Sequence, residues 1–405
     1  MDGNSIIHVL ENGLRIVYTQ RKSNVAYCGI AVNAGSRDEA ELHGLAHFVE
    51  HTIFKGTRRR RAWHILNRME LVGGELNAYT TKEETLVYSV FPAGNMERAV
   101  ELIADLVQNS IFPEKELEKE REVVLEEIHS YRDTPSESIY DDFEDLVFAG
   151  HPLGHNILGS EKSLSRIGQT ECRRYLTELY VPANMVLFAV GRISPERMIK
   201  LAERYFAVMH HKLERPQRIP ACIASPFYET RNIRSHQAHC IIGAPTFGMH
   251  DSRKYALLLL NNMLGGPGMN SALNVAIRER RGYAYTVEAA TTLFTDCGLF
   301  TVYFGCDARQ IEKCLRLVDN EIRRLASDSL KQHTLNAAKK QYIGQLLVGS
   351  ESVEGFALST GKNVLYFGKA GSVKETTERI NAIAIDEIRD IAAGIADNLS
   401  TLIYL

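Results

Sequence analysis

The chain has 405 residues, 47 of them basic and 50 acidic, so its net charge is nearly balanced. A balanced charge gives no general field that would attract nucleic acid or an anionic membrane, and no apolar run reaches the roughly 20 residues of a membrane helix. A chain of this length is expected to form two domains of about 200 residues each.

The N-terminal segment, MDGNSIIHVLENGLRIVY, lacks the features of a targeting signal. It has no basic stretch followed by an apolar one, and it is not rich in arginine and serine. The seven cysteines are scattered and include no C-x-x-C pair, so neither a disulfide framework nor a thiolate zinc site is expected. Both observations predict a cytoplasmic protein.

Strand-like and helical segments alternate along the first half of the chain. The strand pattern covers residues 13–20, 25–35, 73–80, 84–91 and 181–191. The helical pattern covers the histidine-rich stretch that begins at His43, then residues 95–112 and 114–131. Such mixed elements predict an α+β fold with a mostly antiparallel sheet and helices packed on one face.

The second half runs in the same order. Residues 298–325 echo 85–111, and residues 395–405 echo 181–191. Asn184 and Asn398 are 214 residues apart, and Val90 and Tyr303 are 213 apart. Two pairs of matching residues, far apart in the sequence, are thus separated by nearly the same number of residues, which predicts a duplication. We therefore expect two homologous domains, residues 1–209 and 223–405, joined by a polar, proline-containing linker at 210–222.

The stretch HGLAHFVEHTIFKGT contains His47, Glu50 and His51. At about 100° per residue, the three side chains fall within an arc of about 100° on a helix. Two imidazoles on one face can bind the same zinc ion, and the glutamate between them can reach a metal-bound water as a general base. A structural histidine and a chance pentad are the ordinary alternatives, but this inverted order is a metallopeptidase signature. The second half has no such pentad.

A catalytic zinc ion needs a third protein ligand. The glutamate-rich helix expected at 114–131 has an apolar stripe made of Leu117, Val124, Ile128 and Tyr131. Glu120 and Glu127 lie beside this stripe, whereas Glu122 and Glu126 face solvent. Burial of two carboxylates requires a cation nearby. That cation is either the metal ion or an arginine or lysine at the edge of the stripe.

The run Arg58 to Arg61 is the one basic block of the chain. A solvated loop or the start of a helix is the ordinary interpretation of such a run. The alternative is a contact with an acidic partner.

Four stretches resemble the pitrilysin/mitochondrial processing peptidase family of zinc metallopeptidases, particularly its shorter two-domain branch: GLAHFVEHTIFKGT, GGELNAYTTKEETLVYS, EKEREVVLEEIHSYRDTP and HPLGHNILG. The resemblance covers almost the whole chain. It implies that His47, His51 and Glu127 bind one zinc ion per chain and that Glu50 is the general base. Glu120 matches a glutamate that the family keeps close to the catalytic site.

The resemblance also implies how a peptide binds. GGELNAYT, residues 73–80, matches an edge strand to which the substrate adds through main-chain hydrogen bonds. Asn77, Ala78 and Tyr79 would line the scissile region. Because the backbone does the binding, broad specificity for extended peptides is expected.

Arg278 and Tyr285 match an arginine and tyrosine pair of the family, which holds substrate carbonyls and stabilises the tetrahedral intermediate. An arginine seven residues before a tyrosine has little meaning without the resemblance. Pro267, Gly268 and Asn270 depart from the small-residue and serine run that is usual in the family, which puts the shape of this pocket in question.

These features predict a zinc-dependent endopeptidase or oligopeptidase that hydrolyses unfolded or short peptides in an enclosed chamber. One chain would form one half of a clamshell, and a homodimer is expected because the chain keeps both the metal residues and the Arg278/Tyr285 pair. Peptides are the expected partners, without nucleic acid or membrane. The alternative is a non-catalytic or partner-dependent structural subunit of a heteromeric processing peptidase.

Overall fold

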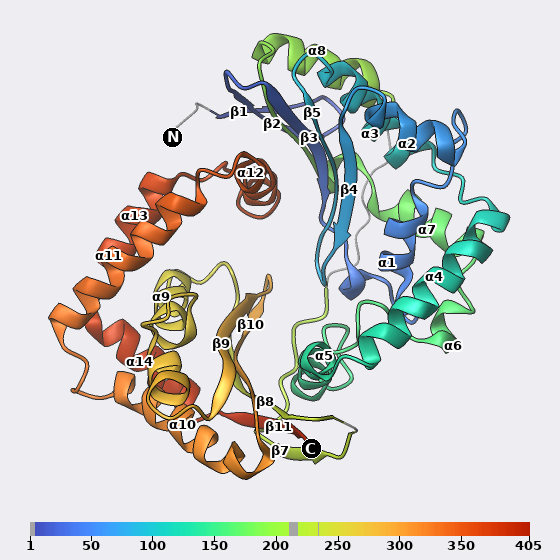
Figure 1. Ribbon diagram of the computed structural model, residues 1–405. Helices are drawn as coiled ribbons and strands as arrows, with labels where there is room; N and C mark the ends of the chain where they lie inside the picture. Colours follow the sequence, from blue (N-terminus) through green and yellow to red (C-terminus); the bar gives the residue numbers. More distant parts are fainter. Residues whose placement is uncertain (1–4, 210–217, 234) are drawn as a thin grey trace. The chain divides into compact units, whose positions relative to one another are not determined.

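The computed structural model describes residues 5–209, 218–233 and 235–405, which form two compact units (Figure 1). Unit 1 comprises Met1–His129, His155–Ile219 and Gly349–Ser372, and unit 2 comprises Ser130–Gly154, Pro220–Val348 and Val373–Leu405. Each unit thus contains a segment from the other half of the chain. Most of the expected linker, residues 210–217, lies outside the described residues.

The sheet of unit 1 has six strands in the order β1-β2-β6-β3-β5-β4. The strands are β1 (Ser5–Val9), β2 (Arg15–Gln20), β3 (Val25–Val32), β4 (Glu75–Thr80), β5 (Thr85–Pro92) and β6 (Met185–Gly191). β2 and β6 are parallel, and the other neighbours are antiparallel. β4 is therefore an edge strand.

The helices of unit 1 cover both faces of this sheet. They are α1 (Leu45–Thr52), α2 (Ala62–Glu70), α3 (Met96–Asn109), α4 (Glu114–Arg132), α6 (Glu161–Leu164), α7 (Gln169–Leu179), α8 (Pro195–Phe206) and α12 (Val353–Phe367). Alternate residues of β3, among them Cys28 and Ile30, pack into the core with α3 and α8, while Ala31 points to the opposite face. That opposite face packs against α12.

Gly361 permits the close approach of α12 to the sheet. A Cβ atom at this position would lie 2.6 Å from Cδ1 of Phe188 in β6, a distance at which the ring or the helix would have to move. Arg15 in β2 strengthens the contact, because its guanidinium donates to the carbonyl oxygens of Val364 and Leu365. A helix from the second half of the sequence is thus built into unit 1.

The sheet of unit 2 has five strands in the order β7-β11-β8-β10-β9. They are β7 (Tyr228–Arg231), β8 (Ala238–Phe247), β9 (Ala284–Leu293), β10 (Cys297–Cys306) and β11 (Ser400–Tyr404). The helices are α5 (Pro135–Val147), α9 (Lys254–Gly265), α10 (Ile311–Ala326), α11 (Gln332–Gly349), α13 (Val373–Ala382) and α14 (Ile385–Ala396), with a short π-helix, η3, at Asn274–Glu279. α9 and α14 share one core with the sheet, and α5 packs on the other face against β8 and β11.

The strand order of the two sheets is the same. β7, β11, β8, β10 and β9 take the places of β2, β6, β3, β5 and β4, and β7 and β11 are again the parallel pair. Val90 in β5 pairs with Tyr27 in β3, and Tyr303 in β10 pairs with Ile241 in β8, as the shared offset requires. The predicted α+β fold of two similar domains with mostly antiparallel sheets is confirmed. The expectation that helices pack on one face is wrong, because the strands carry apolar side chains on both faces and helices cover both. The equivalent helices α5 and α12 are exchanged between the units.

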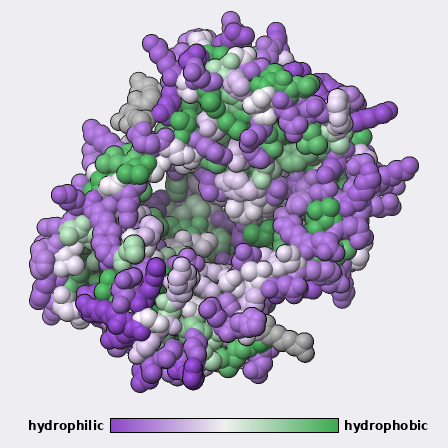
Figure 2. Space-filling model, viewed as in Figure 1, coloured by the Kyte–Doolittle hydropathy of each residue, from purple (hydrophilic) through white to green (hydrophobic). Residues whose placement is uncertain are grey.

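Most large apolar side chains of the described residues are buried in clusters on the two faces of each sheet. Figure 2 shows hydrophilic residues over most of the visible face, with hydrophobic residues in smaller patches between them. In the part of the chain that the structure describes, no helix combines the length and the apolar character needed to cross a bilayer.

Candidate metal centre

Helix α1 carries the H-x-x-E-H pentad, and a buried carboxylate holds its first turn. Gly44, at the N-cap, has a φ of 94°, a left-handed conformation that favours glycine. The backbone N–H groups of Gly44 and Ala46 donate to Oε1 and Oε2 of Glu39 at 2.7 and 2.8 Å. Carboxyl oxygens satisfy N–H groups that have no partner within the first turn of a helix. Glu39 thus sets where the metal-binding helix begins.

Glu39 also connects α1 to the HPLGHNILG stretch. Its Oε1 lies 2.8 Å from Nε2 of His155, whose ring stacks on that of His43 with centroids 3.9 Å apart. Burial raises the pKa of Glu39 to about 8, although the hydrogen bonds from Ala46 and Gly44 act in the opposite direction. Sequence reasoning assigned no role to Glu39 or His155. The signal that could have found Glu39 is an acidic residue five positions before the N-cap glycine.

The ligand atoms of His47, His51 and Glu127 converge. All lie within 4.8 Å of one another, and Oε2 of Glu127 is 3.7 Å from Nε2 of His47 and 3.5 Å from Nε2 of His51. Tetrahedral ligands at about 2.0–2.1 Å from zinc are separated by roughly 3.3 Å. Among the described residues, no other group of three or more histidine, cysteine, aspartate or glutamate side chains has ligand atoms this close together. Two imidazoles and one carboxylate in this arrangement fit a catalytic zinc site.

The protonation state of His47 suits metal binding. Burial, together with the neighbouring His51, lowers the pKa of His47 to about 3, so its imidazole is neutral at physiological pH. A metal binds the neutral imidazole through a ring nitrogen. The other ring nitrogen of His47, Nδ1, is buried and has no hydrogen-bond partner among the described residues.

Glu120 lies behind His51 and not among the converging atoms. Its Oε1 is 3.0 Å from Nδ1 of His51, and its Oε2 is 2.6 Å from Nζ of Lys55. A carboxylate on the second ring nitrogen orients a metal-binding histidine and raises its basicity. The ion pair between a stripe-edge glutamate and a lysine, weighed as an alternative from the sequence, is thus present for Glu120 together with a contact to the metal-site histidine.

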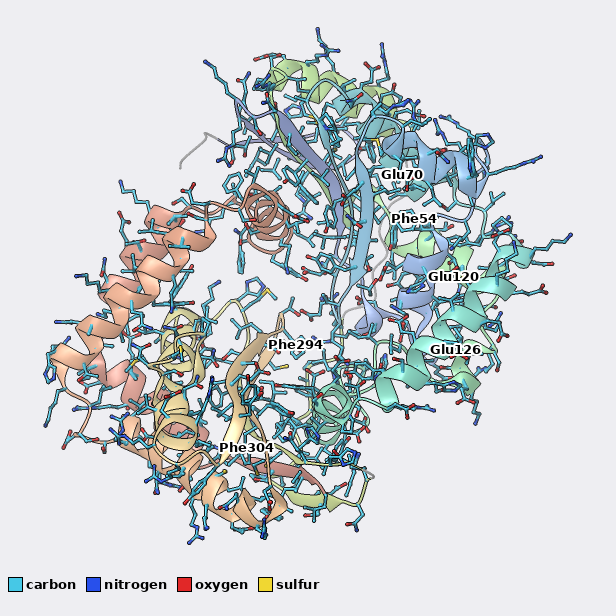
Figure 3. The ribbon with its side chains drawn as sticks, in the orientation of Figure 1. Phe54, Glu70, Glu120, Glu126, Phe294 and Phe304 are labelled. Atoms are coloured by element: carbon cyan, nitrogen blue, oxygen red, sulfur yellow. The ribbon has the colours of Figure 1, made fainter. Side chains whose placement is uncertain are left out.

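Helix α4 presents its glutamates in the predicted phase. Glu120 is buried and the Glu127 side chain is 42% exposed, while Glu122 and Glu126 are exposed. Figure 3 labels Glu120 and Glu126 on α4, which runs beside α1. Of the expected apolar stripe, Leu117, Val124 and Ile128 are buried, and Tyr131 is half-buried.

Glu50 lies on α1 between the two histidines and connects this helix to the edge strand. Burial raises its pKa above the ordinary value, against the charge of His51 and hydrogen bonds from the side chain and backbone of Thr80. Thr80 is the last residue of β4, which packs against α1. A carboxylate with a raised pKa in this position is suited to accept and return a proton.

The residues expected to line the scissile region lie on β4. Asn77, Ala78 and Tyr79 are half-buried, and they pair with Tyr88, Val87 and Leu86 of β5. Within the described residues, no strand pairs with the other edge of β4. This edge offers backbone donors and acceptors to an added strand.

Arg278 and Tyr285 lie together in unit 2. Arg278 is in η3 and Tyr285 in β9, and the guanidinium carbon is 5.3 Å from the centre of the tyrosine ring. Tyr285 is 80% exposed. Both residues line a cavity of about 570 Å³, which Pro267 also borders.

Known families cover most of the chain. Residues 15–161 match the family model described as Insulinase (Peptidase family M16), and residues 166–342 match the one described as Peptidase M16 inactive domain. The first match includes the pentad, and the second begins within the first half of the chain and continues into the half that lacks the pentad.

Curated relatives span nearly the same length. A protein of Bacillus subtilis is 32% identical over 95% of this chain and 94% of its own, and one of Rickettsia bellii is 33% identical over 99% and 97%. A third, from Streptomyces coelicolor, is 32% identical over 95% of this chain and 86% of its own. All three are named uncharacterized zinc proteases.

Two solved structures have the same fold. A protease from Helicobacter pylori has a TM-score of 0.93 and covers 99% of both chains, at 18% identity. A peptidase M16 inactive domain from Pseudomonas fluorescens has a TM-score of 0.92, also at 18% identity, and covers 99% of this chain and 97% of its own. The family models and the relatives above 30% identity confirm the resemblance seen in the motifs: the chain belongs to peptidase family M16, in its short bacterial-type branch.

Proposed function

We propose that the protein is a zinc-dependent endopeptidase or oligopeptidase that cleaves unfolded or short peptides. The observation that carries the proposal is the convergence of His47, His51 and Glu127, with Glu50 on the same helix. The free edge of β4 beside α1 supports a peptide as the substrate. The names of the curated relatives, zinc proteases, agree with this assignment.

One zinc ion per chain would be held by His47, His51 and Glu127, and it would supply a Lewis acid that acidifies water. The substrate extends β4 through main-chain hydrogen bonds, which places a peptide carbonyl near Asn77 to Tyr79. Glu50 accepts the proton of the attacking water and returns it to the leaving amine. Glu120 keeps the His51 ring in its ligating orientation.

Arg278 and Tyr285 complete the proposed site by binding the substrate carbonyls and the developing oxyanion. We place them in a homodimer, in which the metal residues of one protomer act with Arg278 and Tyr285 of its partner in an enclosed chamber. The scattered cysteines and the balanced charge favour a cytoplasmic enzyme that acts on peptides and binds neither nucleic acid nor membrane.

The alternative is a partner-dependent structural subunit of a heteromeric peptidase. The match of residues 166–342 to a model named for an inactive domain favours it. The intact pentad and the position of Glu127 favour catalysis, because a structural subunit needs neither.

The test is incubation of the purified chain with a library of unstructured peptides, with and without a chelator, followed by mass spectrometry of the cuts. Cleavage should require metal. Glu50→Gln should lower the rate by about 10²–10⁴-fold, since it removes the proton acceptor, while zinc analysis still finds one ion per chain. Persistent cleavage by the variant, or loss of its zinc, would contradict the assigned role.

A further inference from the structure

A concave, positively charged surface lies beside the metal helix in unit 1. The surface encloses a pocket of about 960 Å³, which is formed by the segment that follows α1 and by the first residues of α2 and α4. We call it the basic pocket and define it by Lys55, Arg58, Arg59, Arg60, Arg61, Trp63 and Lys115. Neither the proposed zinc ligands nor Arg278 and Tyr285 belong to it.

Buried polar contacts hold the wall of the basic pocket in place. Arg60 binds Glu101 at 2.5 Å and Asp105 at 2.6 Å. The Thr57 hydroxyl donates to Asp105 and accepts from the backbone N–H groups of Arg59 and Arg60. Because these groups are satisfied by the protein, they form a frame and are not available to a ligand.

Four other cations of the pocket face solvent. Arg58, Arg61 and Lys115 are exposed, and the described residues provide no ion-pair partner for them. Arg59 is 65% exposed at the side chain, and its Nε lies 4.0 Å from Asp105. Glu114 and Glu116 are the acidic residues of the lining, and Glu116 pairs with Lys119. The pocket therefore has a local excess of positive charge on a chain whose net charge is −3.

An apolar group complements these charges. Trp63, in the first turn of α2, is 65% exposed at the edge of the pocket. Guanidinium groups bind carboxylates through paired hydrogen bonds, and an exposed indole packs against aliphatic or aromatic side chains. The combination fits a ligand that presents carboxylates and apolar groups along one chain.

The basic pocket is directly connected to the proposed catalytic centre. Nζ of Lys55, in its lining, contacts Glu120, whose other oxygen contacts the His51 ring. In addition, α2 extends from the pocket and packs against the edge strand β4. A ligand in the pocket thus lies within reach of a peptide that is bound along this strand.

We propose that the basic pocket is an exosite that binds an acidic segment of an extended peptide, outside the cleavage site. This inference rests on the proposed peptidase function and specifies a substrate class: peptides that carry aspartate- and glutamate-rich segments. Single-stranded nucleic acid fits less well, because such sites use several stacking aromatic residues along a groove, and this lining has one aromatic residue and two glutamates.

Trp63 is the only tryptophan of the chain, so it reports on this surface alone. The Glu50→Gln protein, loaded with zinc, is titrated with a tryptophan-free peptide rich in aspartate and glutamate, and with a matched peptide of asparagine and glutamine. The acidic peptide should change the tryptophan emission with saturation, and its Kd should rise steeply with salt. An unchanged emission, or an equal response to both peptides, would overturn the proposal.

A pair of matched double variants tests the location. Arg58→Ala/Arg61→Ala removes two exposed cations of the pocket, and Arg197→Ala/Lys200→Ala removes two from α8. The first should weaken binding of the acidic peptide roughly five- to tenfold, since it removes two exposed ion pairs that are each of modest strength. The second should change the Kd less than twofold. Equal effects would show a non-specific charge attraction and reject the pocket.

Two further arms define the ligand and separate this proposal from the peptidase function. Polyphosphate or single-stranded DNA of equal charge should bind more weakly than the acidic peptide, and tighter binding of either would overturn the peptide assignment. Because binding is read from Trp63, it does not depend on cleavage. An active peptidase without this binding would reject the exosite alone, and binding without any cleavage by the wild type would reject the peptidase function alone.

Discussion

The two units share one strand order, but only unit 1 brings metal-ligand residues together among the described residues. Between β3 and β4 it places α1 with the pentad, whereas the corresponding connection from β8 to β9 contains α9, KYALLLLNNMLG, which has neither histidine nor an acidic residue. Likewise, α4 is rich in glutamate, and α11 has no acidic residue. The scaffold is thus shared, and a few polar residues on two helices make the difference.

The strongest way to break this comparison is to remove the proposed third ligand of unit 1. Glu127→Gln should weaken zinc binding more than 100-fold, because an amide replaces the carboxylate that we propose as a ligand. This loss of affinity should exceed the 10–100-fold loss that follows removal of a residue that only hydrogen-bonds to a ligand. Glu126→Gln, on the exposed face of α4, is the matched control and should leave the affinity unchanged. Competition with a chromogenic chelator measures both. The reverse ranking would mean that α4 presents another face to α1.

The contribution of unit 2 can be tested by mixing inactive proteins. Glu50→Gln and Arg278→Ala are each expected to be nearly inactive. Dissociation and reassembly of a mixture of the two proteins should make about half of the dimers mixed. If one protomer supplies Arg278 and Tyr285 to the metal site of its partner, each mixed dimer contains one intact site. Roughly a quarter of wild-type activity should then return. A site contained within one chain would give no recovery, once light scattering has shown that mixed dimers formed.

Glu39 tests how the metal helix is held. Glu39→Ala removes the acceptor of two buried N–H groups, so it should lower the free energy of unfolding by about 1–3 kcal/mol. Glu41→Ala, at an exposed neighbour, is the control and should change it by less than about 0.5 kcal/mol. Denaturant titration measures both, and equal stabilities would show that Glu39 does not hold α1.

The pH dependence of the same residue has a defined sign. Burial raises the pKa of Glu39 to about 8, so the folded protein retains a proton that the unfolded chain releases above its ordinary value of 4.5. The folded state then binds more protons, and stability should fall as the pH rises from 4.5 through 8. Glu39→Gln, which has no titrating group, should show a flatter profile over this range.

The last test concerns the exchanged helices. Gly361→Ala should destabilise the protein by about 1–3 kcal/mol, because the added methyl group meets the Phe188 ring. Gly394 lies in α14, where an added Cβ meets nothing within 4 Å. Gly394→Ala should therefore stabilise by a few tenths to about 1 kcal/mol through helix propensity. Opposite signs in thermal unfolding would support the close contact of α12 with the sheet.

The sequence predicted which side chains share a helix face, because this depends only on the helical period. The three-residue and four-residue spacings placed His47, Glu50 and His51 on one face, and helical phase reduced the glutamates of α4 to Glu120 and Glu127. Helical phase could not distinguish these two glutamates, because both lie beside the apolar stripe. Only the contact between α1 and α4 shows that Glu127 lies near Nε2 of His51 and Glu120 near Nδ1. The resemblance made that distinction.

Long-range contacts were outside the reach of such patterns. Glu39 stabilises α1 by accepting hydrogen bonds from its backbone N–H groups. Backbone contacts leave no periodic pattern in the sequence, so periodicity could not identify this residue. The amphipathic patterns of α5 and α12 predict burial, but they do not say which sheet each helix covers. The exchange between the units became visible only with the tertiary contacts.

The exchange of α5 and α12 has a consequence for biosynthesis. A ribosome releases the chain from its N-terminus, so the strands of unit 1 emerge long before residues 349–372, which complete that unit. Until then, one face of the first sheet, with Ala31, Val186 and Phe188, has no partner helix. Exposed apolar faces of partly folded chains aggregate or recruit chaperones. The first half should therefore be insoluble when expressed alone, and adding the α12 segment as a separate peptide should rescue it.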